Sequence, residues 1–230
     1  MAVFLFGRSG GDSLSPIFSE NSWEQIIKAC QRNKVPDTWL VGDYKMMTIN
    51  GIEYQIDIIG KNHDTYSDGT GKAPLTLQLH HCYDVGLYRM NDTATNVGGW
   101  SDCLIRSTHL PVIFAQLPEV VRVGIRPVNK MTSEGNASST IVTTADTLFL
   151  LAENEIFGVR TFSANGEGPQ YAYYKEGNSK VKNYDNSSRE WYTRSPTGND
   201  RYTFALVNYR GETGVSDPTV PMGVSFAFCF

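Results

Sequence analysis

The first apolar pattern along the chain is that of a helix. Four apolar residues recur with the i, i+3, i+4 and i+7 spacing of one helix face: Trp23, Ile26, Ile27 and Cys30. Just before this face, Ser22 and Gln25 stand three residues apart, which is the spacing of a capping box. The pattern therefore predicts a helix that begins after Ser22 and ends before Pro36.

Extended segments dominate from residue 38 onward. Two apolar stretches flank Asn50-Gly51, a dipeptide typical of a two-residue hairpin turn. Short helices are expected around Ser101 and over 108–117, where Pro111 stands in the first turn. The last stretch is as apolar as any, so we expect the C-terminus to lie inside the main sheet. Further strands are predicted within 75–88, 120–128, 146–158, 202–212 and 223–230.

Two polar stretches interrupt this pattern. Residues 131–144 form a predicted surface loop, and residues 161–201 form a long irregular insertion rich in Gly, Asn, Ser and Tyr. One early helix, strands throughout and long loops predict an α+β fold with a mixed or antiparallel sheet and one or two helices. We expect a single domain over residues 21–230, preceded by an arm and linker over residues 1–20.

The composition excludes several classes of partner. The 230 residues carry a net charge of −4 and no long basic run, so we do not expect binding to nucleic acid. No stretch approaches the ~20 apolar residues of a membrane span, and the first residues lack the basic segment of a signal peptide. Four scattered cysteines predict reduced, mostly buried thiols rather than a zinc site or a disulfide scaffold. We expect a soluble protein made in a cytosol, without a cofactor.

Two clusters combine tryptophan with arginine, in GGWSDCLIR (98–106) and EWYTRS (190–195). In a structural interpretation, the arginines lie inside the protein and bind backbone carbonyls or a carboxylate such as Asp102 or Asp146, while the indole rings pack over them. Long loops need such contacts, because their buried carbonyls have no strand partner. In a binding interpretation, the clusters and nearby tyrosines hold a sugar or a carboxylate. We favour the structural interpretation; the candidates of the binding interpretation are Trp100, Arg106, Tyr171, Tyr174, Trp191 and Arg194.

The remaining reactive side chains do not predict an active site. His63-Asp64 and residues 80–82 (His-His-Cys) have metal-ligand types, but the second segment offers at most two on one face, so we expect no metal. Glu153 and Glu155 have the spacing of two carboxylates on one strand face, as acid–base catalysis requires. They follow an apolar run at a predicted strand end, where charged residues ordinarily face solvent. We therefore expect a protein that is not an enzyme.

Several short motifs occur in the order of one protein family. They are SWEQI (22–26), VGD (41–43), IIGKNHD (58–64), GGW (98–100), LIR (104–106), DTLFLL (146–151), WYTRS (191–195) and the terminal Gly-Val strand (223–228). From about residue 22 to the end, the chain resembles a domain-of-unknown-function family of phage proteins and of surface or secreted proteins of Gram-positive and gut bacteria. It is more distantly similar to C-type-lectin-like folds. Where the family usually has Arg-Pro after Gly-Val, this chain has Ser225 and Phe226.

The resemblance implies a non-enzymatic component of a bacteriophage virion, on the capsid surface or at the tail or baseplate. Its C-type-lectin-like domain would present residues 131–144 and 161–201 to a host-surface glycan, and many copies would strengthen weak contacts. We expect an oligomer on the particle, in which the apolar arm adds a strand to a neighbouring virion subunit. The alternatives are a frayed N-terminus, a pure decoration protein that stabilises the shell, and a small enzyme acting on cell-wall glycan. The arm residues are Val3, Phe4, Leu5 and Phe6.

Overall fold

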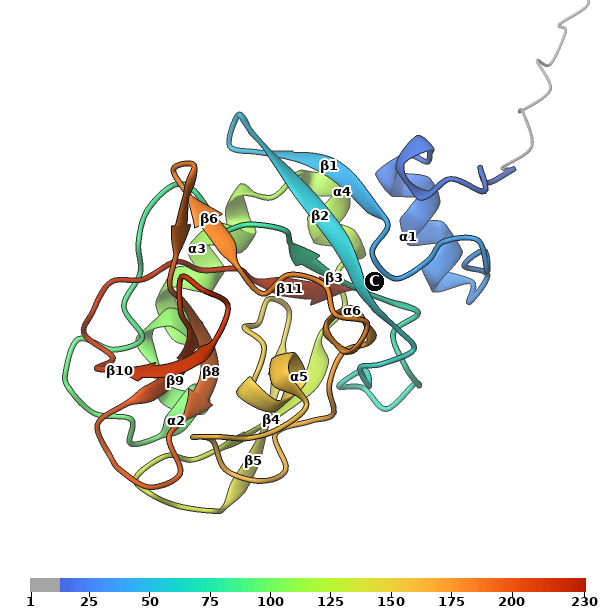
Figure 1. Cartoon of the computed structure of the whole chain (residues 1–230). Helices are drawn as coiled ribbons and strands as arrows, with labels where there is room; N and C mark the ends of the chain where they lie inside the picture. Colours follow the sequence, from blue (N-terminus) through green and yellow to red (C-terminus); the bar gives the residue numbers. More distant parts are fainter. Residues whose placement is uncertain (1–12) are drawn as a thin grey trace, which may run out of the picture.

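The computed structural model describes residues 13–230, and the described chain begins with helical segments beside the main sheet (Figure 1). A 3-10 turn, η1 (Phe18–Glu20), precedes helix α1 (Trp23–Gln31). The Gln25 backbone N–H donates to Ser22 Oγ at 3.3 Å, and the Ser22 N–H donates to the Gln25 side chain at 2.8 Å. This reciprocal pair confirms the predicted capping box and the start of the helix.

The main sheet has four antiparallel strands in the order β1-β2-β3-β11. They are β1 (Tyr44–Ile49), β2 (Ile52–Lys61), β3 (Leu75–Leu79) and β11 (Ala227–Cys229). Asn50 and Gly51 join β1 to β2 with φ of 50° and 81°, the positive values that a type I′ turn requires at both positions. The predicted hairpin is therefore confirmed. The C-terminal strand also lies in the main sheet as predicted, because β11 pairs with β3 and is buried throughout.

A second group of strands packs beside this sheet. A three-stranded antiparallel sheet has the order β10-β9-β8, with β8 (Trp191–Pro196), β9 (Phe204–Val207) and β10 (Thr213–Ser216). The two-stranded hairpins are β4 (Val128–Ser133) with β5 (Ile141–Asp146), and β6 (Lys182–Tyr184) with β7 (Ser187–Arg189). Phe149 bridges Ala227 and Trp191 bridges Gly223, so both groups share one core.

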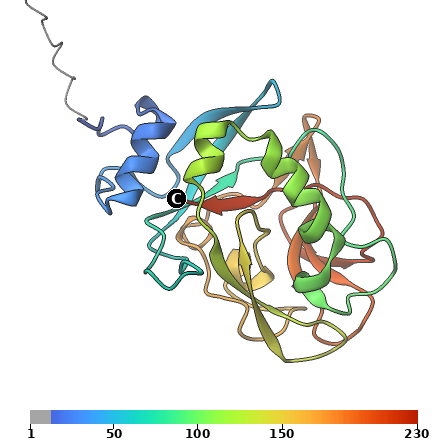
Figure 2. The same ribbon diagram turned by 180° about the vertical axis from the view of Figure 1, so that it is seen from behind.

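Short helices complete the fold. They are α2 (Gly99–Asp102), the π-helical turn η2 (Ile105–His109), α3 (Leu110–Gln116), α4 (Glu119–Gly124), α5 (Glu153–Phe157) and α6 (Ala172–Lys175). Helices α3 and α4 cover the side of the molecule seen in Figure 2. Mostly antiparallel sheets with short helices confirm the predicted α+β class, although the described residues contain more than the one or two helices predicted.

The predicted secondary structure is wrong in two segments, where tertiary packing determines the structure. Residues 120–128, predicted as a strand, contain helix α4, because Val121 and Gly124 lie on one helix face and Gly124 fits closely against Ile27 of α1. Residues 131–144, predicted as a polar loop, contain the ends of the β4–β5 hairpin. Buried polar residues such as Thr132 fill its inner face, so hydrophobicity alone does not reveal it.

Two later segments also differ from the prediction. Residues 146–158, predicted as a buried strand, form an extended stretch with one bridge at Phe149 and then helix α5. Residues 161–201 are only partly irregular, because α6, β6, β7 and β8 lie within them. All six residues of β8 are buried although half are polar or charged, and this is why the segment lacks an apolar pattern.

Three sequence predictions concern the chain as a whole. The cysteines of the protein are free and buried, as predicted: Cys30, Cys82, Cys103 and Cys229. Within residues 13–230, no helix has the length and apolar character needed to cross a membrane. The predicted docking arm, residues 3–6, lies outside the described residues and stays a prediction.

Candidate functional site

Four charged side chains meet in the interior between the two groups of strands. Lys130 of β4 donates to Asp64 Oδ1 and to Glu155 Oε1, each at 2.7 Å from its Nζ. Arg194 of β8 binds Glu155 with both terminal nitrogens, at 2.5 Å from Nη1 and 3.0 Å from Nη2. Their side chains are at most 3% exposed. Two cations thus balance two anions, the arrangement that buried charges require.

The two cations keep the buried carboxyl groups ionised. Burial raises the pKa of Asp64, but the Lys130 ammonium and the Thr76 hydroxyl outweigh it and lower that pKa to about 2. Burial likewise raises the pKa of Glu155, and Arg194 and Lys130 together lower it below its ordinary value. At neutral pH, this cluster is a closed set of ion pairs.

Glu167 borders the cluster but has a different electrostatic environment. Its Oε1 accepts the Ser133 backbone N–H at 3.0 Å, and its Oε2 bonds with the Ser195 hydroxyl. Burial raises the pKa of Glu167 to about 7, against the smaller lowering effects of these bonds and of the Arg194 charge. Glu167 therefore changes protonation near neutral pH.

Buried polar side chains also hold the irregular loops. The Glu153 carboxylate accepts the backbone N–H groups of Thr161, Phe162 and Ser163 at 3.1, 3.0 and 2.8 Å. Arg194 donates to the carbonyl oxygens of Leu150 and Glu167 as well as to Glu155. These bonds satisfy loop backbone groups that have no strand partner, and they fix the loops from inside.

A second set of bonds joins three loops, 134–140, 160–168 and 197–203, which we call the loop face. Asn96 accepts the Asn136 N–H at 2.8 Å and donates to the Thr203 carbonyl at 2.9 Å. The Ala137 N–H donates to the Asp200 carbonyl at 2.9 Å, and the Gly198 N–H donates to the Phe162 carbonyl at 2.8 Å. Hydrogen bonds therefore join the three loops of the loop face to one another.

The first Trp/Arg cluster has the arginine–carboxylate contact of the structural interpretation. Trp100 Nε1 donates to Asp146 Oδ2 at 2.9 Å, and Arg106 Nε donates to Asp146 Oδ1 at 2.6 Å. Gly99 has a φ of 54° and comes so close to β4 that a Cβ there would overlap the Ser133 carbonyl oxygen. The GGW motif thus serves a tight approach of backbone to backbone.

The other members of the predicted binding patch make contacts in the interior. Trp191 Nε1 donates to the Lys180 carbonyl at 3.0 Å, and the Tyr174 hydroxyl donates to Gln78 Oε1 at 2.7 Å. The Tyr171 hydroxyl bonds with Asp64 and receives a bond from Lys130. Of the six candidates only Arg106 is partly exposed, and the structure does not bring them to one surface; the buried five are Trp100, Tyr171, Tyr174, Trp191 and Arg194.

Glu153 and Glu155 are predicted to face solvent at a strand end, and this prediction is wrong. Both side chains lie buried in helix α5. Glu155 also belongs to a group of metal-ligand types, with His63 and Asp64, whose ligand atoms lie within 4.8 Å of one another. Lys130 Nζ bonds with both carboxylates of that group and supplies positive charge there. The His63 ring stacks on Tyr171 with centroids 3.9 Å apart.

Sequence reasoning did not single out Lys130, Glu167 or Asn96. Lys130 stands between inward-facing Val128 and Thr132 on β4, so alternation along this strand marks it as buried once the hairpin is recognised. Glu167 and Asn96 lie in irregular loops, where no periodicity marks an inward side chain.

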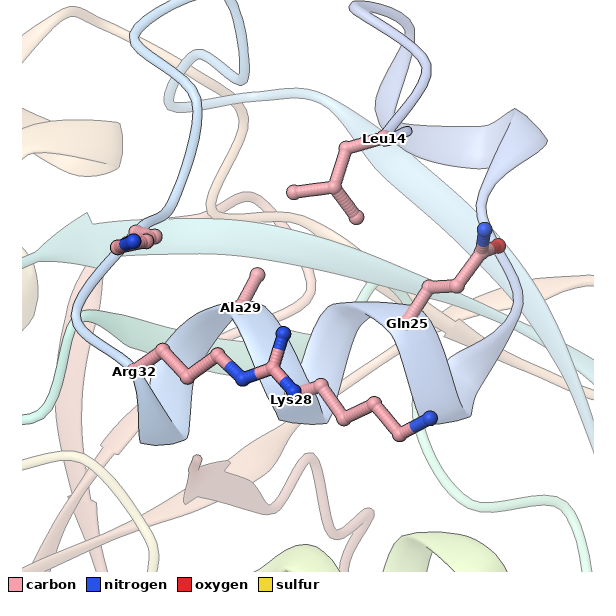
Figure 3. Close-up of a pocket in the computed structure, with 6 residues that line it drawn as sticks. Leu14, Gln25, Lys28, Ala29 and Arg32 are labelled. Carbon is pink, nitrogen blue, oxygen red and sulfur yellow. The ribbon is translucent and has the colours of Figure 1, made fainter. Parts of the chain in front are cut away.

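A shallow groove lies at the other end of the molecule, along α1 (Figure 3). Leu14 points toward Ala29 across it, and Lys28 and Arg32 run along its edge. The groove therefore has a small apolar floor and a basic rim, next to the point where the described chain begins.

The comparison with protein families matches most of the chain to one family. The model of a domain of unknown function, DUF6273, matches residues 83–229, which include β4, α5, β8 and β11. The resemblance was expected from about residue 22, so α1 and the first hairpin lie outside the match. No curated protein and no solved structure matches the chain. The match covers more than half of the sequence, and the chain therefore belongs to the DUF6273 family.

Proposed function

We propose that this protein is a non-enzymatic display component of a bacteriophage or phage-like particle, on the capsid surface or at the tail or baseplate. In this proposal, a C-type-lectin-like domain carries the loop face outward to a host-surface glycan. The observation that carries the proposal is the placement of two features at opposite ends of the molecule. Helix α1, where the described chain begins, is at one end, and the β4–β5 hairpin with its loop is at the other (Figures 1 and 2).

The end near α1 suits attachment. The described chain begins at Ser13, and Leu14 packs over α1 beside basic Lys28 and Arg32. An apolar arm anchored in a neighbouring subunit would hold this end against the particle. The opposite end would then point away from the particle surface.

The loop face suits recognition because its loops are fixed before any ligand binds. Glu153 and Asn96 hold the three loops from inside, through the bonds described above. A loop that is already ordered loses less conformational entropy on binding, and this favours affinity. Many copies on one particle would add to it.

The non-enzymatic part of the proposal is supported by the bonds of the two candidate carboxylates. Glu153 accepts three backbone N–H groups, and Glu155 is paired with Arg194 and Lys130. Both carboxylates thus stabilise the fold through these bonds. An enzyme acting on cell-wall glycan would need other acid and base residues.

Immunogold electron microscopy of particles purified from the source culture tests the proposal. We expect label on heads or tails, and particles with a variant lacking residues 1–12 should lose it. The deletion stops there because Ser15 accepts a bond from Trp39 Nε1 at 3.0 Å and receives one from Asn21. The control is Glu53→Gln, an exposed change in β2 that does not line the groove. Unlabelled particles would contradict the virion assignment, and full occupancy after the deletion would contradict docking by the arm.

Binding of the purified protein to host cell-wall fragments tests the outward-facing role. We expect co-sedimentation with the fragments and no release of reducing sugar. Label on the particles without any binding to fragments would favour a pure decoration protein. Release of reducing sugar would favour the enzyme.

A further inference from the structure

We propose that a hollow in the loop face binds an acidic saccharide, which deepens the proposed function by naming the ligand class and its site. The hollow has a volume of about 430 Å³, within the range of small-molecule sites. Segments from all three loops form it. The lining residues are 137–139, 160–165, 198 and 199.

A buried serine closes part of the wall of the hollow. Ser163 lines the hollow and is only 4% exposed, yet its Oγ has no hydrogen-bond partner among residues 13–230. Its backbone N–H is bound by Glu153, so the residue is held in place while the hydroxyl stays free. The oxygen is enclosed by protein, so Ser163 forms part of the rigid wall and leaves ligand contacts to the exposed lining residues.

The charge of the lining selects the kind of saccharide. Arg160 is the one charged residue of the lining, it is exposed, and it forms no ion pair within the described part of the chain. No carboxylate lines the hollow, although the chain as a whole has a net charge of −4. An unpaired guanidinium in such a site favours a ligand carboxylate, which it can bind through two parallel hydrogen bonds.

The other lining residues match the rest of a sugar. Phe162 is half-buried and offers an aromatic surface for the C–H face of the ring, while Asn165 and Asn199 provide amide donors and acceptors. The hollow is also rigid, because the Gly198 N–H bonds with the Phe162 carbonyl and Ser163 bridges Thr197. A sugar with a carboxylate would thus meet a prepared site.

Two sugars that differ only in a carboxylate test this inference. We would titrate the 15N-labelled full-length protein with glucuronic acid and with glucose and follow amide shifts by NMR. We expect glucuronic acid to bind at least tenfold more tightly than glucose, with the largest shifts at residues 160–165. Equal affinity for the two sugars, or shifts spread outside the hollow, would overturn the inference.

Variants separate the two recognition elements. Arg160→Gln should remove the preference for glucuronic acid, and Phe162→Ala should weaken the binding of both sugars severalfold, because it removes the aromatic surface of the hollow. The control Arg89→Gln changes an exposed arginine outside the hollow and should bind as the parent does. Parental binding by both hollow variants would overturn the inference.

The fragment-binding assay keeps this inference distinct from the proposed function. If both hollow variants still bind host cell-wall fragments as the parent does, the site is wrong but the display role stands. If the particles carry no label, the display role is wrong regardless of how tightly the two sugars bind.

Discussion

Replacing Glu167 with glutamine should flatten the pH dependence of stability between about pH 4.5 and 7. Burial raises the pKa of Glu167 from 4.5 to about 7, so the folded protein keeps this proton over a range where the unfolded chain has lost it. The contribution of this proton to the free energy of unfolding is therefore fully present below pH 4.5. It falls as the pH rises to about 7 and is constant above that pH. At about 1.4 kcal/mol per pH unit, the loss is about 3 kcal/mol.

Glutamine keeps the bonds of the protonated side chain but cannot ionise. Its oxygen can accept the Ser133 N–H, and its NH₂ group can donate to the Ser195 hydroxyl. The charge of Arg194 and the carboxylate of Glu155, which face Glu167, remain unchanged. Relative to the parent, the variant should gain about 3 kcal/mol at pH 8 compared with pH 4.5.

Urea unfolding of parent and variant from pH 4.5 to 8 measures this difference. The comparison must be made between the two proteins, because His63 in the unfolded chain also takes up a proton in this range. Burial lowers the pKa of His63, so its contribution to stability is lost as the pH falls below 6.5 and opposes that of Glu167. Glu176→Gln, an exposed change, should give a curve parallel to that of the parent. A Glu167→Gln curve that is also parallel would refute the assignment of a raised pKa.

Two further substitutions test the interior. Lys130→Met should cost about 3 to 5 kcal/mol in urea unfolding, because it leaves Asp64 buried without its cation, whereas exposed Lys175→Met should cost little; a small loss for Lys130→Met would mean that the ion pairs are not formed. Gly99→Ala should cost about 2 to 5 kcal/mol, from its positive φ and the overlap with the Ser133 carbonyl, while Gly86→Ala, whose Cβ would contact nothing, should be nearly neutral. Equal midpoints for the two glycine variants would show that the close approach at GGW is absent.

The sequence predicted the local structure best where side chains act on their own backbone. The capping box at Ser22 and the turn at Asn50-Gly51 depend on two adjacent or nearby residues, so their signatures survive in any context. Helix α4 was missed because its β-branched valines favour a strand locally, and only packing against α1 selects the helix.

The candidate site could be predicted only in part. The Arg106 contact with Asp146 followed from the need to satisfy buried groups near long loops, whereas the Trp100 bond to the same carboxylate was not predicted. The loop hollow could not be predicted, because Arg160 and Ser163 belong to an irregular segment and become neighbours of residues 137–139 only through the fold.

A buried ion pair and a strand pair cross the start of the family match. The family match starts at residue 83, yet β11 pairs with β3, and Lys130 pairs with Asp64, and both partners precede that point. A fragment limited to the matched residues would expose one edge of β11 and leave Lys130 with a single carboxylate partner. The family match therefore covers only part of this core, because its residues pair with β3 and Asp64 outside it.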